Sequence, residues 1–187
     1  AIRPCICCHN ACFNMAHYNG VGNDQTLSDN AGMARCALNP ETMQSKKYFL
    51  SRTDKPKKIA VIGGGIGGME AARVLTLRGH KVTLYEKSDR LGGVFIAAAA
   101  PSFKEKDRDL IRWYEKELRD LNVDVRLNTE IRALRELTAD EIVVATGSTP
   151  RRLPVKGAER AIEACDYLLD RAEVGQRVII IGGGLTG

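Results

Sequence analysis

The sequence lacks an apolar run long enough to cross a membrane, and it lacks a concentrated basic region. A membrane-spanning helix needs about 20 predominantly apolar residues, and the apolar stretch FIAAAAP at 95–101 is far shorter. The formal net charge is +5, yet the densest basic run is only KPKK at 55–58, directly before a strand-like segment. A nucleic-acid-binding protein is expected to gather more positive charge than this. The sequence therefore predicts neither a membrane partner nor a nucleic-acid partner.

A signal-peptide pattern is also missing, because the sequence opens directly on AIRPC. We therefore expect a cytoplasmic protein, and structural disulfides are rare in that compartment. The chain nevertheless has six cysteines, four of which fall in CICCHNAC at 5–12. A structural zinc, a redox-active thiol pair and an iron–sulfur cluster then stand beside disulfides as explanations for this end of the chain.

The 187 residues divide into a poorly patterned start and a strongly patterned remainder. Residues 1–45 are rich in Cys, Asn and Gly and have weak periodicity, and SRTDKP at 51–56 is typical of a linker. Beyond it, apolar runs predict strands at 58–62, 81–86, 123–127, 141–146 and 177–181, and helical spacing predicts helices at 67–78, 106–121 and 164–172. The alternation of strands and helices predicts an α/β fold with a Rossmann-like parallel sheet.

A glycine-rich segment follows the first expected strand, in KIAVIGGGIGG at 58–68. In the dinucleotide-binding fingerprint G-x-G-x-x-G, Gly63 allows a tight turn, Gly65 lets the backbone approach a pyrophosphate, and Gly68 lets the helix pack on the strand. The helix N-terminus then offers N–H groups and the positive end of its dipole to the phosphates. Glu86 ends the second strand, where an acid accepts hydrogen bonds from ribose hydroxyls. The predicted dinucleotide-binding residues are Gly63, Gly65, Ile66, Gly67, Gly68, Glu86 and Lys87.

Two later motifs resemble those of FAD enzymes. EKSDRLGG at 86–93 resembles a flavoprotein stretch in which an acid is followed by a Gly-Gly pair near the flavin. IVVATGSTP at 142–150 resembles a second flavoprotein motif, a strand that ends in Ala-Thr-Gly close to FAD. The resemblance implies that the dinucleotide is FAD, and it adds Gly92, Gly93, Ile131, Ala145, Thr146 and Gly147 to the predicted site.

The chain contains one internal repeat, because RVIIIGGGLTG at 177–187 matches KIAVIGGGIGG at 58–68. The repeat places Gly182, Gly184 and Gly187 where a second dinucleotide loop would begin. A complete domain is not expected to stop inside a phosphate loop, so we expect the 187 residues to be a fragment of a larger protein.

The cysteine spacing narrows the alternatives without deciding between them. Cys5, Cys8 and Cys12 are spaced C-x2-C-x3-C, and Cys36 follows far behind. Zinc sites usually draw their ligands as two separated pairs, whereas a [4Fe–4S] cluster needs four thiolates, and this is not the bacterial ferredoxin spacing. Three ligands on one short loop with a distant fourth fit a cluster better, but two nearby histidines keep a mixed zinc site open; these are His9 and His17.

The order of the motifs gives a more specific comparison. The segments RPCICCHNAC, CALNP, GGGIGG, ATG and GGGLTG are arranged as in the old-yellow-enzyme-like iron–sulfur flavoproteins, a family that the chain resembles over nearly its whole length. That family includes 2-enoate reductase, 2,4-dienoyl-CoA reductase and trimethylamine dehydrogenase. The resemblance implies that a [4Fe–4S] cluster is held by Cys5, Cys8, Cys12 and Cys36. It leaves out Cys7, where the family commonly has a small residue, and the loop 13–35 is longer than usual.

In that family an FMN-binding (β/α)8 barrel precedes the cysteine motif, and FAD and NAD(P)H domains follow it. The resemblance implies an NAD(P)H-dependent oxidoreductase that reduces an activated C=C bond, with electrons passing from NAD(P)H to FAD, through the cluster and on to FMN. The small-molecule substrate would lie in the barrel, so no catalytic residue is assigned in this chain. An amine dehydrogenase of the same scaffold and a zinc-structured redox sensor or binding module are the alternatives.

The same comparison divides the chain into four expected units. These are an iron–sulfur segment at 1–50, a linker at 51–57, the first part of an FAD domain at 58–152, and a connection with the start of an NAD(P)H domain at 153–187. The substrate, the choice between NADH and NADPH, and the oligomeric state are left open by the sequence.

Overall fold

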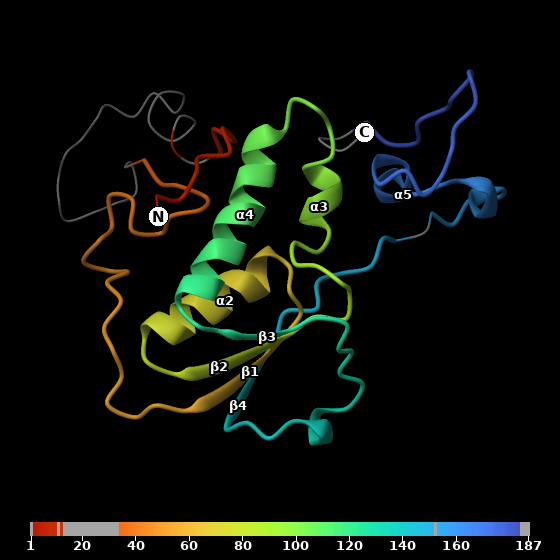
Figure 1. The fold of residues 1–187 in the computed structure, drawn as a ribbon. Helices are drawn as coiled ribbons and strands as arrows, with labels where there is room; N and C mark the ends of the chain where they lie inside the picture. Colours follow the sequence, from red (N-terminus) through yellow and green to blue (C-terminus); the bar gives the residue numbers. More distant parts are fainter. Residues whose placement is uncertain (1, 11, 13–33, 152, 184–187) are drawn as a thin grey trace.

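The centre of the computed structural model is a four-stranded parallel sheet (Figure 1). The structure describes residues 2–10, 12, 34–151 and 153–183. The strands are β1 (Lys58–Ile62), β2 (Lys81–Tyr85), β3 (Asp124–Arg126) and β4 (Glu141–Val144), in the order β3-β2-β1-β4. This order leaves β1 in the interior, and its last four residues are all buried. The predicted α/β class with a Rossmann-like parallel sheet is confirmed.

Two long helices connect and cover the strands. Helix α2 (Ile66–Leu77) joins β1 to β2, and helix α4 (Glu105–Asp120) precedes β3; both lie on the same face of the sheet in Figure 1. Shorter elements complete the chain: α3 (Phe95–Ala98), η2 (Leu134–Glu136), η3 (Ala158–Arg160) and α5 (Ala164–Leu168). Among the described residues, no helix has the length and apolar character needed to span a membrane.

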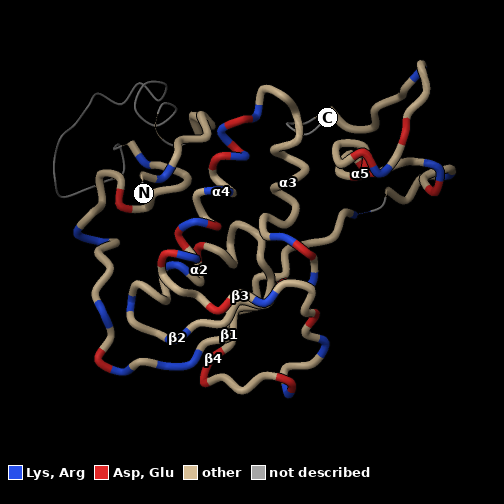
Figure 2. The backbone as a smooth tube through the Cα atoms, viewed as in Figure 1, with Lys and Arg blue, Asp and Glu red and all other residues tan. Residues whose placement is uncertain are grey.

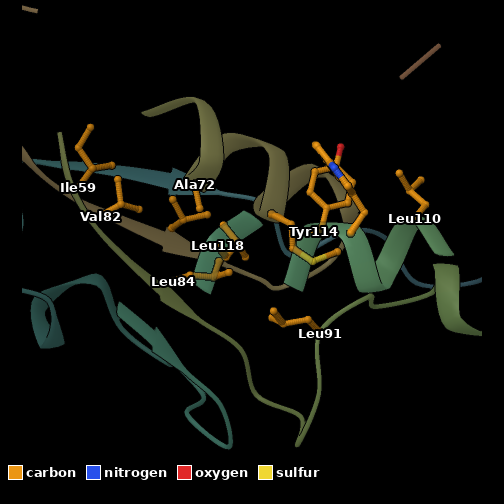
Figure 3. Packing of buried hydrophobic residues seen from close by; sticks show 11 residues of the cluster. Ile59, Ala72, Val82, Leu84, Leu91, Leu110, Tyr114 and Leu118 are labelled. Atoms are coloured by element: carbon orange, nitrogen blue, oxygen red, sulfur yellow. The ribbon is translucent and has the colours of Figure 1, made fainter. Parts of the chain in front are cut away.

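The core lies between the sheet and this pair of helices (Figure 3). In β2, Val82 and Leu84 are buried while the residues between and after them are only partly covered, as expected for a strand with one packed face. Helix α4 contributes Leu110, Tyr114 and Leu118 to the cluster, each at most 2% exposed. Charged residues of both signs are interspersed along α4, as the colours of Figure 2 show.

One strand prediction is wrong and another is wrong in part. Residues 177–181 form no strand, and Ile179 and Ile180 are 90% and 72% exposed. A strand needs neighbours to complete its backbone hydrogen bonds, and no described strand lies beside this segment. The strand expected to be buried at 141–146 ends at Val144, which is 64% exposed because β4 forms an edge of the sheet.

Residues 1–50 are called the cysteine-rich segment below. Its described residues form no regular helix or strand, as its weak periodicity predicted. Its first residues lie beside α4, and residues 34–57 then run down to β1 (Figure 1). Ile6 and Leu38, from the two ends of the segment, both pack against the core cluster. The segment is therefore attached to the sheet domain at two places that are distant in sequence.

Candidate dinucleotide and cysteine sites

The first glycine loop begins with a turn that only glycine accommodates. Gly63 has φ +107°, and its N–H donates to the Tyr85 carbonyl oxygen over 2.8 Å. A Cβ atom on Gly63 would lie 2.3 Å from the carbonyl oxygen of Ala145. The Ala145 N–H in turn donates to the Ile62 carbonyl oxygen over 2.8 Å. The Ala-Thr-Gly motif after β4 therefore lies directly against the glycine loop after β1.

The start of α2 fits a phosphate ligand. A Cβ atom on Gly68 would lie 1.8 Å from the Gly63 carbonyl oxygen, so this glycine permits the close packing of helix on turn. Gly65 caps the helix without a side-chain hydrogen bond, and a Cβ atom there would meet nothing within 4 Å. The first N–H groups of an α-helix have no partner within the helix, and the dipole is positive at this end. Open space in front of such donors is the arrangement that binds a pyrophosphate.

Glu86 is held in place by donors from two loops. One carboxylate oxygen accepts the Gly64 N–H over 2.6 Å, and the other accepts the Ser88 N–H and hydroxyl, each over 2.8 Å. Burial alone would raise the pKa of Glu86, which is 8% exposed, but the backbone donors of Ser88 and Gly64 outweigh it and lower the pKa below its usual 4.5. The side chain is therefore a fixed carboxylate at the carboxyl end of β2.

A pocket of about 270 Å³ opens beside Glu86 at the carboxyl ends of β1 and β2. Five residues predicted from the sequence line it: Gly63, Glu86, Lys87, Ile131 and Thr146. Four lining residues were missed: Ile62, Tyr85, Thr129 and Glu130. The loop that carries Thr129 is tied to the end of β2, because the Thr129 N–H donates to the Glu86 carbonyl oxygen over 2.9 Å. Its position just after the expected strand at 123–127 was the available signal, since carboxyl ends of parallel strands meet at one edge of the sheet.

The Gly-Gly pair also lies against the first glycine loop. The Gly92 N–H donates to the Gly64 carbonyl oxygen over 2.8 Å, and Gly65 pairs with Gly92 in a parallel bridge. A Cβ atom on Gly93 would lie 3.0 Å from the Gly65 Cα. The pair thus supports the phosphate loop from the side. Gly64, to which the fingerprint assigns no role, thus contacts both Gly92 and Glu86.

In the second glycine loop, the described glycines Gly182 and Gly183 do not line this pocket. Gly182 has φ +113° and is exposed, and a Cβ atom there would meet nothing within 4 Å. Gly184 and Gly187 lie outside the described residues. Gly147 follows the Ala-Thr-Gly turn with φ +76° and likewise has open space around it.

The predicted cluster cysteines are free thiols at the surface of the cysteine-rich segment. Cys5, Cys8 and Cys12 are exposed and Cys36 is partly buried. Within the described ranges, no three Cys, His, Asp or Glu side chains are grouped as metal ligands would be. Two of the predicted ligands nevertheless have a feature that suits thiolates: the Cys5 Sγ accepts the Cys7 N–H over 3.3 Å, and the Cys36 Sγ accepts the Leu38 N–H over 3.4 Å. Hydrogen bonds to the sulfurs help to set the potential of a cluster.

The parallel sheet, the glycine loop on α2 and the acid after β2 define a Rossmann-like domain of the FAD- and NAD(P)-binding type. Residues 28–136 and 132–187 match the family model of the pyridine nucleotide-disulphide oxidoreductases, and the chain belongs to that family.

Known proteins confirm the resemblance indicated by the order of the motifs. Cinnamate reductase of Clostridium sporogenes is 44% identical over 188 residues, which cover 100% of this chain but 26% of that protein. A structure of 2-naphthoyl-CoA reductase has 30% identity and a TM-score of 0.73, covering 78% of this chain and 23% of the other. A structure of histamine dehydrogenase from Rhizobium sp. 4-9 has 26% identity and a TM-score of 0.58, covering 64% of this chain and 19% of the other. The matched part of the chain thus spans about a fifth to a quarter of the length of these relatives.

Proposed function

We propose that this chain is the electron-transfer part of an NAD(P)H-dependent flavin oxidoreductase that reduces an activated C=C bond. The observation that carries the proposal is the 44% identity to cinnamate reductase along the whole chain, cysteine-rich segment included. The similarity to a structure of 2-naphthoyl-CoA reductase supports the same reaction class. Each turnover would consume one NAD(P)H and one proton, and would add two electrons and two protons to the double bond.

The residues around the pocket would hold FAD by its adenosine and pyrophosphate. The N–H groups at the start of α2 would bind the phosphates, where Gly65 leaves room. The Glu86 carboxylate already accepts three hydrogen bonds, one from Gly64 and two from Ser88. A carboxylate has about four acceptor positions, so one is left for a ribose hydroxyl. FAD, when bound, supplies the capacity to accept a hydride from NAD(P)H and release its electrons one at a time.

The cysteine-rich segment would hold the [4Fe–4S] cluster through Cys5, Cys8, Cys12 and Cys36. Four thiolates are the donor set that this cluster requires, and its chemistry is one-electron transfer. Metal–thiolate bonds would organise a segment whose described residues form no regular helix or strand. We further propose that FMN and the substrate are held by a part of the longer protein that precedes this chain.

Gly65→Ala in the full-length protein tests the FAD site. A methyl group at position 65 meets no protein atom, so the stability of the apoprotein should stay within about 0.5 kcal/mol of the original. The same methyl group would occupy the approach of the pyrophosphate, so the affinity for FAD should fall about tenfold or more. Flavin fluorescence titration measures the affinity. Gly175→Ala, another position without neighbours, is the control and should leave FAD binding unchanged. Unaltered affinity in Gly65→Ala would contradict the proposed phosphate site.

Cys36→Ser in the full-length protein tests the cluster. Protein purified without oxygen should contain about four irons per chain, as this cluster type requires. Cys36→Ser should lose iron and block reduction of FMN by NAD(P)H while FAD is still reduced. Cys7→Ser, the matched control in the same loop, should keep both the iron and FMN reduction. One zinc per chain and no iron would instead support the zinc-structured alternative.

An amine dehydrogenase on the same scaffold is the second candidate, favoured by the similarity to the histamine dehydrogenase structure. Anaerobic mixing separates the two functions. A reductase has its flavin bleached by NAD(P)H, whereas an amine dehydrogenase has its flavin bleached by an amine and is indifferent to NAD(P)H.

A further inference from the structure

The Arg3 side chain connects both ends of the cysteine-rich segment to the sheet domain. One guanidinium nitrogen donates to the Leu38 carbonyl oxygen, and another donates to both carboxylate oxygens of Glu70 on α2, each over 3.0 Å. The Arg3 side chain is only 13% exposed. A planar guanidinium suits this task because its donors point in several fixed directions at once.

The same guanidinium lies over aromatic rings of α4. Its central carbon is 4.6 Å from the centroid of the Trp113 ring and 5.8 Å from that of Tyr114. The two rings pack edge to face with centroids 4.8 Å apart. A cation over an aromatic face is stabilised further when it is shielded from water. Arg3 is therefore held by α2 and α4 together.

Arg73 on α2 shares these partners and provides a comparison within the chain. It donates to both Glu70 oxygens, over 2.9 and 3.0 Å, and its guanidinium carbon is 5.6 Å from the Trp113 centroid. Burial would raise the pKa of Glu70, but the two arginines lower it overall, so the carboxylate stays charged between them. Within the described residues, the contacts of Arg73 are to α2 and α4, whereas those of Arg3 extend to the cysteine-rich segment.

A short chain of hydrogen bonds leads from Arg3 to a predicted cluster ligand. Leu38 accepts from Arg3 through its carbonyl oxygen and donates through its N–H to the Cys36 Sγ. On the other side, Arg3 is two residues before Cys5, whose sulfur accepts the Cys7 N–H. The Arg3 guanidinium is thus linked to Cys36 through hydrogen bonds of Leu38, and Arg3 itself is linked to Cys5 by the short stretch of backbone between them.

We propose that Arg3 is a positioning residue that fixes the parts of the cysteine-rich segment around Cys5 and Cys36 against α2 and α4. Arg3 thereby holds the cluster in place for electron transfer from FAD. This inference rests on the proposed function. It follows because a shared anchor restricts both ligand-bearing ends relative to the domain that holds FAD, and electron transfer weakens steeply as the distance between carriers grows.

The test uses full-length protein purified without oxygen and carrying Arg3→Gln, Arg3→Lys or Arg73→Gln. Hydrogen exchange of the Cys7 and Leu38 amides reports on anchoring, and rapid mixing with NAD(P)H reports separately on FAD and FMN reduction. In Arg3→Gln, exchange at both amides should rise about tenfold to a hundredfold, the loss of a charge-assisted hydrogen bond. FMN reduction should slow, while FAD reduction should stay as fast as in the original protein.

Arg3→Lys keeps the positive charge but loses the planar guanidinium with its several donors. The rise in amide exchange and the slowing of FMN reduction should therefore both be smaller than in Arg3→Gln. Arg73→Gln should leave exchange at both amides and FMN reduction as in the original protein. Unchanged exchange in Arg3→Gln, an equal rise in Arg73→Gln, or full-speed FMN reduction despite faster exchange would each overturn the proposal. Absence of iron from the original protein would instead contradict the proposed function, and comparison of the Arg3→Gln and Arg73→Gln exchange rates would still decide whether Arg3 anchors the segment.

Discussion

The two glycine loops have nearly the same sequence and very different surroundings. In KIAVIGGGIGG the apolar residues form β1, which pairs with β2 on one side and β4 on the other. In RVIIIGGGLTG the residues at 177–181 form no strand, and 178–181 are all more than half exposed. The first glycines nevertheless share a backbone conformation, because Gly63 has φ +107° and Gly182 has φ +113°.

The difference separates local from non-local determinants of structure. A glycine turn depends on the freedom of a single residue, so it forms with or without neighbours. A strand is stabilised by cross-strand hydrogen bonds and by burial, which are supplied by residues distant in sequence. The second segment has the sequence of a strand and, within the described residues, lacks the partners of one.

The largest expected effect comes from matched alanine substitutions at the first glycines. Gly63→Ala forces an L-residue into a left-handed conformation and places a Cβ atom 2.3 Å from the Ala145 carbonyl oxygen. It should cost about 3 kcal/mol or more of stability. Gly182→Ala meets no neighbour and lies in an unpaired segment that can adjust, so the cost should stay below about 1 kcal/mol. Urea unfolding followed by the fluorescence of Trp113, the single tryptophan, measures both. Equal costs would break the comparison.

A second pair of substitutions compares corresponding apolar residues in the two copies of the repeat. Val61 is completely buried in β1, and the corresponding Ile180 is 72% exposed. Val61→Ala should destabilise the chain by about 2 kcal/mol through lost burial and a residual cavity. Ile180→Ala should change it by less than about 0.5 kcal/mol. In the full-length protein we expect Ile180→Ala to become costly, because the second segment would then pair within an NAD(P)H domain. A negligible effect there would argue against that domain.

The smallest effect concerns the acid that ties the first loop to β2. The pKa of Glu86 is lowered in the folded chain, so its stabilisation is fully present above the unfolded value near 4.5 and is lost as the pH falls through the lower folded value. Glu86→Gln should cost about 1 kcal/mol at pH 7, the net contribution of a typical hydrogen bond. The gap between the two proteins should then narrow as the pH falls below 4.5. Asp89→Asn, whose side chain is 79% exposed, is the control and should change the stability at pH 7 by less than about 0.5 kcal/mol. Urea unfolding at a series of pH values measures the gap, and a constant gap would contradict the assigned pKa direction.

Elements whose causes are local or periodic could be predicted from the sequence. Apolar runs gave the positions of β1 and β2 within one residue, and helical spacing did the same for α2 and α4. Glycine spacing identified the turn at Gly63, because few other residues tolerate its conformation. The order of short motifs identified the family, since each motif depends on close backbone approach to a ligand or to another strand.

Features that join distant segments could not be predicted from the sequence and depend on how the chain folds. The tertiary structure placed Thr129 in the pocket and assigned Gly64 as the donor to Glu86. It left β4 at an edge of the sheet, so that Val144 is exposed although its sequence predicts burial. It also brought Arg3 from the cysteine-rich segment onto Trp113 of α4. Each of these depends on which backbone groups and side chains meet across the fold, and residue spacing along the chain does not contain that information.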